Sequence, residues 1–232
     1  MTSNPEIVIN LKGLKWYYLN TEKRTDRKEH IEEILTKYDL SFTRIQGQAM
    51  TNKYTSGALG MANIVETHLK TGNFTPFVIL EDDVSWSENL DETWLSLKVP
   101  TDADAIHLGI SNAFCLPYVK ECGGPALKQR HPTLRHLFRI YNMLSLHSVL
   151  ILTEKYARAF YQSMIQAATV GYCWDTFSCR LQVNFEIYAL EKPLMFQDSK
   201  LGGQESETKI DWTKDGSTVG SSFDPKRYYI TR

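Results

Sequence analysis

The stretch FVILEDDVSW, residues 77–86, decides how the rest of the chain is interpreted. Its first four residues are apolar, as in a buried strand, and three carboxylates, Glu81, Asp82 and Asp83, follow without a break. Like charges so close together raise one another's free energy unless a cation or solvent screens them. The sequence therefore predicts a central strand that ends at an acidic cluster in need of a cation.

The segments before this strand alternate between strand and helix patterns. Strands are predicted over residues 15–20 (KWYYLN) and 41–47 (SFTRIQG), and helices over residues 25–38 and 55–70, where apolar residues favour one face. A β-α-β-α-β order of this kind is typical of a parallel sheet with helices on its faces. The sequence therefore predicts an α/β fold whose central sheet is Rossmann-like, mostly parallel and flanked by helices.

The second half of the chain is predicted to be more mixed. Its expected elements are strands at residues 105–109, 134–140 and 146–152, helices at about 153–168 and 175–183, and a strand at 185–190. Residues 117–132 and the tail after Gln197 are predicted to be loop. Because no internal repeat or low-complexity linker interrupts the chain, we expect one domain over residues 1–232, with halves of about 1–110 and 111–232.

Composition excludes several classes of protein. With 232 residues, 42% of them hydrophobic, the chain can build a sizeable core, and its formal net charge of -1 provides no basic field for nucleic acid. No window approaches the roughly 18 apolar residues of a membrane span, and the polar start MTSNPEIVIN is unlike a signal peptide. We therefore expect a cytoplasmic protein with no transmembrane segment and no nucleic-acid partner.

Two strand ends place polar side chains at one edge of the predicted sheet. Asn20 ends the first strand, and Asp82 and Asp83 follow the third. In parallel sheets, ligands bind in the crevice beyond the carboxyl ends of the strands. Carboxylates there would hold a hard cation, Mg²⁺ or Mn²⁺, with positions left open for phosphate oxygens and water. The alternative is an ordinary surface cluster in which one aspartate caps a helix.

Three basic residues, Arg24, Arg27 and Lys28, crowd the start of the first predicted helix. The helix dipole disfavours cations at that end, so the pattern indicates an anionic ligand, a phosphate or diphosphate, between them. The alternative is a solvated helix start in which Lys28 pairs with Glu32 one turn on and Asp26 offsets the charge.

Three further patterns are weaker indications of a site. Gly57 and Gly60 frame the start of the second predicted helix, where glycines permit either close backbone approach to a ligand or a tight helix entry. Asp175 begins a predicted helix beside Trp174, and it is either a helix cap or a general base next to an aromatic ring suited to a sugar face. Asp198 is the reserve candidate for base or metal ligand, although a turn would use the same residue.

Together, the segments YYLNTEKRTDRK, GALG, FVILEDDV and PLMFQDSK resemble the family 25 glycosyltransferases, which include bacterial lipooligosaccharide galactosyltransferases and collagen galactosyltransferases. The chain is also similar to glycosyltransferases encoded by large DNA viruses of algae, for which the expected location is the host cytoplasm. The resemblance covers roughly residues 16–202 and is more specific in the first half. It implies a GT-A fold, a UDP-linked sugar donor, a divalent metal and inversion at the anomeric carbon.

The resemblance also implies roles for individual residues. Nucleotide contacts are expected from the first strand end, the first helix, the glycine pair and the acidic cluster, namely Leu19, Asn20, Arg24, Asp26, Arg27, Gly57, Gly60, Glu81 and Asp82. Asp83 and Asp82 match the metal motif. Asp175 falls where the family has its acceptor-side acid, and Asp198 is again the reserve.

The chain departs from the family at one motif. Where the family reads C-x-L-S-H after its second glycine, this chain has Met61, Asn63, Ile64 and Val65, so the usual Ser-His pair is absent. The departure leaves the donor sugar and the acceptor open, while the metal residues still match.

The predicted function is metal-dependent, inverting transfer of a hexose from a UDP-sugar to a hydroxyl of a glycan or glycoprotein. The alternative is a sugar-nucleotide-binding module with little transferase activity. A nucleotidyltransferase is disfavoured, because LNTEKRTDRK contains no glycine that would cradle a phosphate.

Overall fold

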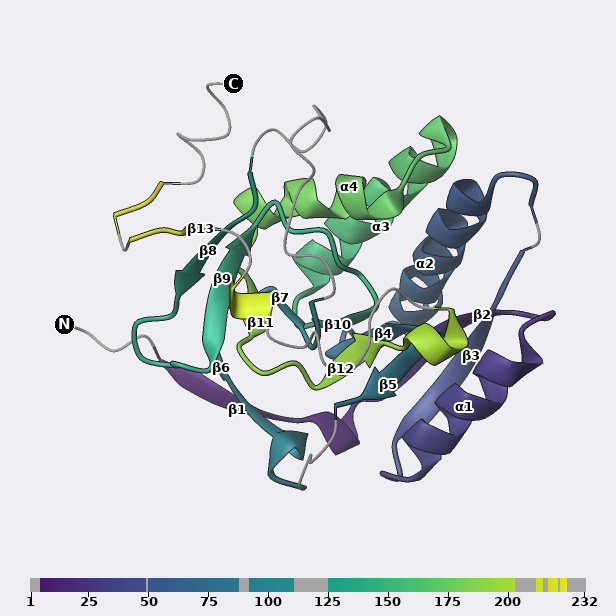
Figure 1. Cartoon of the computed structure of the whole chain (residues 1–232), viewed down its shortest axis with the longest axis horizontal. Helices are drawn as coiled ribbons and strands as arrows, with labels where there is room; N and C mark the ends of the chain where they lie inside the picture. Colours follow the sequence, from purple (N-terminus) through teal and green to yellow (C-terminus); the bar gives the residue numbers. More distant parts are fainter. Residues whose placement is uncertain are drawn as a thin grey trace.

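The computed structural model (Figure 1) describes residues 5–48, 50–87, 92–110, 125–202, 212–214, 217–220 and 222–224. The fold is α/β, and the described strands form one nine-stranded mixed sheet and two small two-stranded sheets. Half of the predicted loop at 117–132, and most of the predicted tail after Gln197, lies outside the described residues. The loop prediction is wrong for Leu127–Arg130, which form a strand. None of the described helices is long and apolar enough to cross a bilayer.

The first half of the chain forms the predicted β-α-β-α-β order. Strand β2 (Lys15–Thr21) is followed by helix α1 (Thr25–Thr36), strand β3 (Ser41–Gly47), helix α2 (Lys53–Leu69) and strand β4 (Phe77–Glu81). In the sheet, β2 lies between β3 and β4 and is parallel to both. The carboxyl ends of the three strands therefore meet at one end of the sheet.

The second half adds strands in both directions. The remaining strands of the large sheet are β7 (Ala105–His107), β8 (Leu127–Arg130), β9 (Leu137–Tyr141), β10 (Ser148–Ile151), β11 (Ile187–Leu190) and β13 (Ser217–Thr218). The sheet order is β13-β8-β9-β11-β7-β10-β4-β2-β3, with β10 antiparallel to both of its neighbours.

The prediction of a mostly parallel sheet is wrong for this second half. Among its described strands, β11 is parallel to β7 and β13 to β8, whereas β9 is antiparallel to both β8 and β11. The described chain between β4 and β10 contains no α-helix. A helical crossover of the kind that usually joins parallel neighbours is thus absent from the described part of this segment, and β10 is antiparallel to β4.

The other elements flank the large sheet. Strand β1 (Glu6–Asn10) pairs with β6 (Ser96–Pro100), and β5 (Val84–Trp86) pairs with β12 (Met195–Gln197), both antiparallel. The remaining described helices are α3 (Glu154–Val170), α4 (Trp174–Ser178) and the short 3-10 helices Leu11–Gly13, Glu92–Leu95, Cys179–Val183, Ser199–Leu201 and Trp212–Lys214. The predicted helix over 175–183 is therefore divided into α4 and one 3-10 turn.

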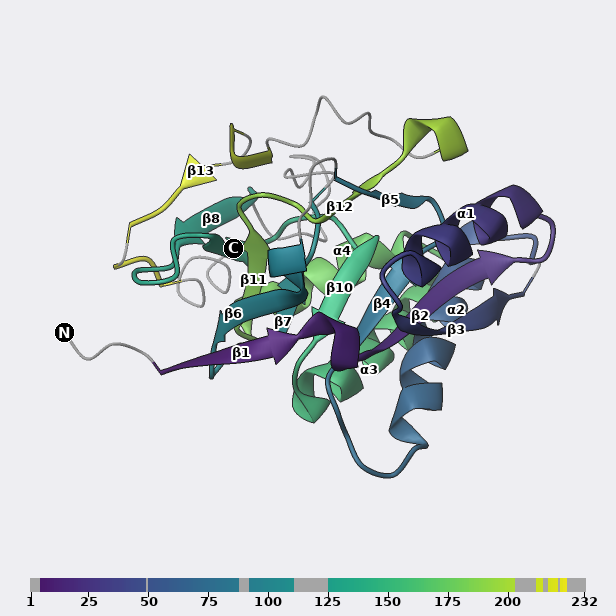
Figure 2. The same ribbon diagram turned by 90° about the horizontal axis from the view of Figure 1, so that it is seen from below.

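Helices cover both faces of the strands that end at the acidic cluster. Figure 2 shows α1 on one side of β2, β3 and β4, and α2 and α3 on the other. Alternate residues of β4 pack into two cores, Val78 and Leu80 with α1, and Phe77 and Ile79 with α2 and α3. This double burial explains the unbroken apolar run before Glu81, because a strand covered on both faces needs no polar side.

Candidate functional site

A cleft of about 690 Å³ opens where the carboxyl ends of β2, β3 and β4 meet the first turns of α1, α2 and α4. Most of the predicted site residues line it, namely Leu19, Asn20, Arg24, Arg27, Gly57, Glu81, Asp82, Asp83 and Asp175. The predicted residues Asp26, Gly60 and Asp198 do not line it. The parallel half of the sheet therefore brings together polar groups from distant parts of the sequence.

The acidic cluster meets its cation within the chain. Nη1 of Arg27 lies 2.8 Å from Oδ1 of Asp82 and 3.2 Å from Oδ2 of Asp83, and Asn20 Nδ2 donates to Asp82 Oδ2 at 2.7 Å. All four side chains lie at the adjacent ends of β2 and β4 and in the first turn of α1. Arg27 therefore already performs part of the neutralisation that the sequence assigned to an external cation.

Asp83 is only partly satisfied by this ion pair. Its Oδ1 atom is buried and has no hydrogen-bond partner among the described residues. Burial raises the pKa of the Asp83 carboxyl even though the Arg27 guanidinium opposes the change. A buried carboxylate oxygen without a donor is costly unless a ligand completes its environment.

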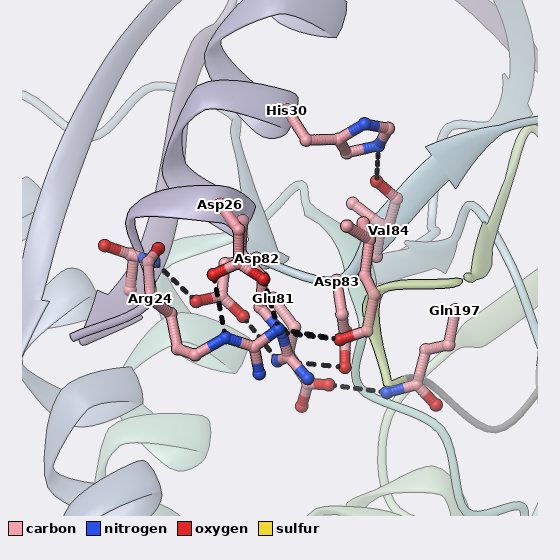
Figure 3. A network of polar contacts seen from close by, with 11 residues as sticks. Arg24, Asp26, His30, Glu81, Asp82, Asp83, Val84 and Gln197 are labelled. Atoms are coloured by element: carbon pink, nitrogen blue, oxygen red, sulfur yellow. Dashed lines mark hydrogen bonds and ion pairs between the residues drawn. The ribbon is translucent and has the colours of Figure 1, made fainter. Parts of the chain in front are cut away.

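Glu81, at the end of β4, has a different partner from the two aspartates. Its Oε2 atom accepts a hydrogen bond from Nε2 of Gln197 at 2.8 Å, as Figure 3 shows. Burial is the main cause that raises the pKa of Glu81 well above its ordinary range, and the charges of Asp83 and Asp175 add to it. Gln197, at the end of β12, also lines the cleft and was not chosen as a site residue from the sequence.

Asp175 lies in the first turn of α4, as its helix-start pattern indicates. Its Oδ1 atom is buried without a hydrogen-bond partner among the described residues, and burial raises the pKa of the carboxyl to about 6. A carboxylate with a raised pKa in a cleft is suited to accept a proton near neutral pH.

Arg24 and Asp26 bind each other rather than the acidic cluster. Nε and Nη2 of Arg24 donate to the two carboxylate oxygens of Asp26 at 2.9 and 2.7 Å, and this pairing lowers the pKa of Asp26 to about 2. Arg24 Nη2 and Arg27 Nε also donate to the carbonyl oxygen of Leu201, each at 2.9 Å. The basic helix start therefore holds the turn after β12 against α1.

Asp198 has a structural position next to the cleft. Ser85 Oγ donates to its Oδ2 at 2.9 Å, and its Oδ1 accepts from the backbone N–H of Lys200, which caps the 3-10 helix Ser199–Leu201. His30 Nε2 lies 2.9 Å from the same Ser85 hydroxyl. Both carboxylate oxygens of Asp198 thus accept hydrogen bonds, whereas the Oδ1 atoms of Asp83 and Asp175 have no partner among the described residues.

The two glycines of α2 give room to side chains. A Cβ atom at Gly57 would stand 2.4 Å from the ring of Trp174, and one at Gly60 would stand 2.4 Å from Cδ1 of Leu19. Gly57 therefore lets the indole of Trp174 lie directly against the helix, whereas Gly60 gives space to a residue on β2.

The described residues contain no group of three His, Cys, Asp or Glu side chains arranged to hold a metal ion. The unpartnered Oδ1 of Asp83 nevertheless suits a hard cation. Proteins often bind Mg²⁺ through one or two carboxylates, and oxygens of the substrate and of water complete the coordination shell. Asp82 would be the second ligand only if it loosened its contacts with Arg27 and Asn20.

Two of the cleft residues that were not predicted from the sequence lie at the start of α2. Helix α2 begins at Lys53, two residues earlier than predicted, because the Asn52 side chain accepts from the N–H groups of Tyr54 and Thr55. Lys53 and Tyr54 therefore line the cleft. The Asn52 cap was the signal in the sequence that could have located them.

No family model matches the chain, and no curated protein matches it. Among solved structures it is similar to a glycosyltransferase involved in the glycosylation of the major capsid of PBCV-1, with 11% identity over 64% of this chain and 65% of that one and a TM-score of 0.36. It is also similar to A197 from STIV, with 13% identity over 78% and 83% and a TM-score of 0.41.

A third similar structure is the Drosophila β1,4-galactosyltransferase 7 in complex with manganese, UDP-Gal and xylobiose, with 8% identity over 85% of this chain and 74% of that one and a TM-score of 0.36. The chain spans 65% of the length of the PBCV-1 enzyme. At such low TM-scores these likenesses carry no conclusion about activity.

Replacing Asp175 by asparagine is expected to stabilise the protein near neutral pH. The folded-state pKa of about 6 exceeds the ordinary value of 3.8, so the folded protein binds the Asp175 proton more tightly than the unfolded chain does. The stability of the wild type therefore falls as pH rises from about 4 to about 6. Urea unfolding should show Asp175→Asn to be more stable by about 1–3 kcal/mol at pH 7.

This advantage should shrink as the pH falls through 6 and disappear near pH 4, where the wild-type carboxyl is protonated in both states. Equal unfolding free energies for the two proteins at pH 7 would show that Asp175 is solvated rather than buried.

Proposed function

We propose that this chain is a glycosyltransferase of the GT-A type. It would move a hexose from a UDP-sugar, with inversion and with the help of Mn²⁺ or Mg²⁺, to a hydroxyl of a glycan or glycoprotein. The observation that carries the proposal is the cleft at the carboxyl ends of β2, β3 and β4, where the buried Oδ1 atoms of both Asp83 and Asp175 have no partner among the described residues.

The nucleotide would occupy the part of the cleft formed by the end of β2 and the start of α1. Leu19, Asn20 and Arg24 line this part. A nucleotide ligand in the crevice beyond parallel strand ends agrees with the general behaviour of α/β sheets. The order from β2 to β4 also suits the nucleotide-binding half of a GT-A domain, with the acceptor side in the second half of a single domain.

A divalent cation would bind at Asp83, with Asp82 as a second ligand. Bound there, the ion would supply charge stabilisation to the diphosphate as it leaves. Burial raises the pKa of Asp83 although Arg27 lies nearby, which agrees with a carboxylate that Arg27 alone does not fully neutralise. Among the described residues that line the cleft, Lys53 has no carboxylate partner, so it is a second source of positive charge for the phosphates.

Asp175 would act as the general base. Its Oδ1 takes the proton of the acceptor hydroxyl, the hydroxyl oxygen forms a bond to the anomeric carbon, and the bond from that carbon to the diphosphate oxygen breaks. The bonding electrons leave with UDP, and attack opposite the leaving group inverts the configuration. Asp198 stays the reserve for this role, but both of its oxygens already accept hydrogen bonds.

One observation favours the second candidate, a sugar-nucleotide-binding module. Arg27 already neutralises Asp82 and contacts Asp83, so the acidic cluster is stable without a metal. A binding module would take up UDP-sugar and leave it intact. Release of free UDP from a panel of UDP-hexoses with Mn²⁺ therefore discriminates between the two candidates and tests the proposal.

Replacing Asp83 by asparagine is expected to remove UDP release. The neutral amide keeps the shape of the side chain but binds a hard cation poorly, so the rate should fall on the order of 100-fold or more. The matched control is Asp39→Asn, since Asp39 is 88% exposed and pairs with Lys12 outside the cleft. Wild-type rates for Asp83→Asn would contradict the assignment of Asp83.

Replacing Asp175 by asparagine is expected to lower kcat for transfer by about 10²–10⁴-fold, because the amide cannot accept the hydroxyl proton. For the wild type, kcat should rise with pH up to about 6 and then level off, because only the ionised carboxylate is a base. Steady-state kinetics over pH 4.5–8 (roughly the range spanned by this group) measure both effects. A pH profile that Asp175→Asn leaves unchanged would point to another base.

A further inference from the structure

Three aromatic side chains lie side by side along one wall of the cleft. They are Tyr54 of α2, Trp174 of α4 and Tyr172, in the turn before α4; we call them the aromatic shelf. The ring centroids of Tyr54 and Trp174 are 6.3 Å apart, and those of Tyr54 and Tyr172 are 6.4 Å apart. Tyr54 and Trp174 line the cleft itself, and Tyr172 extends the surface beyond its rim.

Backbone contacts hold the aromatic shelf in place. Asn52 Nδ2 donates to the carbonyl oxygen of Gly171 at 2.9 Å, which joins the start of α2 to the turn that carries Tyr172. Thr55 Oγ1 donates to the carbonyl oxygen of Ala168 at 3.2 Å, and the bare Gly57 backbone supports the indole of Trp174. The rings are therefore positioned before any ligand arrives, which lowers the entropic cost of binding.

Part of the aromatic shelf is exposed to solvent, unlike the aromatic side chains of the core. Tyr172 leaves 42% of its surface open to solvent. Of the other large hydrophobic side chains that are exposed in the described chain, Ile7 and Val8 belong to β1, while Met50 and Val170 flank the shelf in sequence. An exposed apolar surface that continues into a cleft indicates a binding surface.

We propose that the aromatic shelf binds the sugar ring of the acceptor. The assignment of this sugar as the acceptor rests on the proposed function. The prediction that the aromatic shelf binds a sugar rests on the rings alone. The electron-rich face of an aromatic ring attracts the C–H groups on the apolar face of a pyranose. Lys53 and Ser56, which line the cleft next to Tyr54, offer hydrogen bonds to hydroxyl groups at the edge of the sugar.

The aromatic shelf also ends at the candidate base. Trp174 and Asp175 are consecutive residues in the first turn of α4, and both line the cleft. The ring planes of Tyr54 and Trp174 are inclined by 64°, so a pyranose stacks on the face of one of them and borders the other. In the cleft it lies close to the Asp175 carboxylate, which has a buried, unpartnered oxygen. This position fits the acceptor, whose hydroxyl must reach the base, better than the donor, whose diphosphate belongs near Asp83.

Saturation-transfer NMR with simple sugars tests the proposal without a known acceptor. The probes are methyl β-D-galactopyranoside, methyl β-D-glucopyranoside and methyl α-D-mannopyranoside, each titrated into the whole chain. We expect the wild type to bind at least one of them. Tyr54→Ala should weaken that binding about tenfold, because a ring inside the cleft is lost.

Two variants serve as controls. Tyr54→Phe keeps the ring and should bind like the wild type, and Tyr161→Ala removes a tyrosine from a separate hollow between α2 and α3. Failure of the wild type to bind any glycoside, or equal binding by Tyr54→Ala, would overturn the proposal. UDP release is measured in parallel. Glycoside binding that depends on Tyr54, in a protein that releases no UDP, would support the aromatic shelf and contradict only the proposed transfer.

Discussion

The guanidinium of Arg27 is the cation that allows three consecutive carboxylates to end a buried strand. Its Nη1 atom contacts Asp82 at 2.8 Å and Asp83 at 3.2 Å, and its Nε donates to the carbonyl oxygen of Leu201 at 2.9 Å. One side chain thus joins α1, the end of β4 and the turn after β12. Breaking such a buried pair leaves uncompensated charge and costs about 3–5 kcal/mol. The shape of the cleft therefore depends on this contact.

The same contact limits how the cleft can receive a phosphate ligand. Four carboxylates line it, Glu81, Asp82, Asp83 and Asp175, against three basic side chains, Arg24, Arg27 and Lys53. Because two of the basic groups are engaged with carboxylates, a diphosphate would meet little free positive charge. A divalent cation bound at Asp83, as proposed, would resolve this conflict, since it would offset the charge of carboxylate and phosphate together.

The sequence was sufficient to predict the parallel half of the sheet. Residues 77–80 are apolar without alternation because both faces of β4 are covered, and the strand and helix patterns before them are strong. The antiparallel half was not predictable in the same way. The direction of β10 depends on whether a crossover precedes it, and short strands such as β12 have too few residues to show a period.

Most of the residues predicted at the strand ends line one cleft, but the pairing among them was not predicted. An excess of cations at residues 24–28 and an excess of anions at residues 81–83 were each interpreted as the mark of an external ligand. Because β2 and β4 are neighbours in the sheet, the start of α1 lies beside the end of β4. Arg27 then pairs with Asp82, so part of the positive charge neutralises part of the negative charge. Two opposite charge imbalances that follow adjacent parallel strands should therefore first be tested against each other.

The central claim is that Asp83 and a divalent cation together form the donor site. Calorimetric titration of UDP into the wild-type protein, once with Mn²⁺ and once with EDTA, tests it most directly. The account predicts a measurable binding heat with Mn²⁺ that disappears in EDTA, because the diphosphate cannot approach the carboxylates without the ion. Equal binding in both titrations, or none in either, would contradict this claim. The acidic cluster would then have a structural role only, as the ion-pair partner of Arg27.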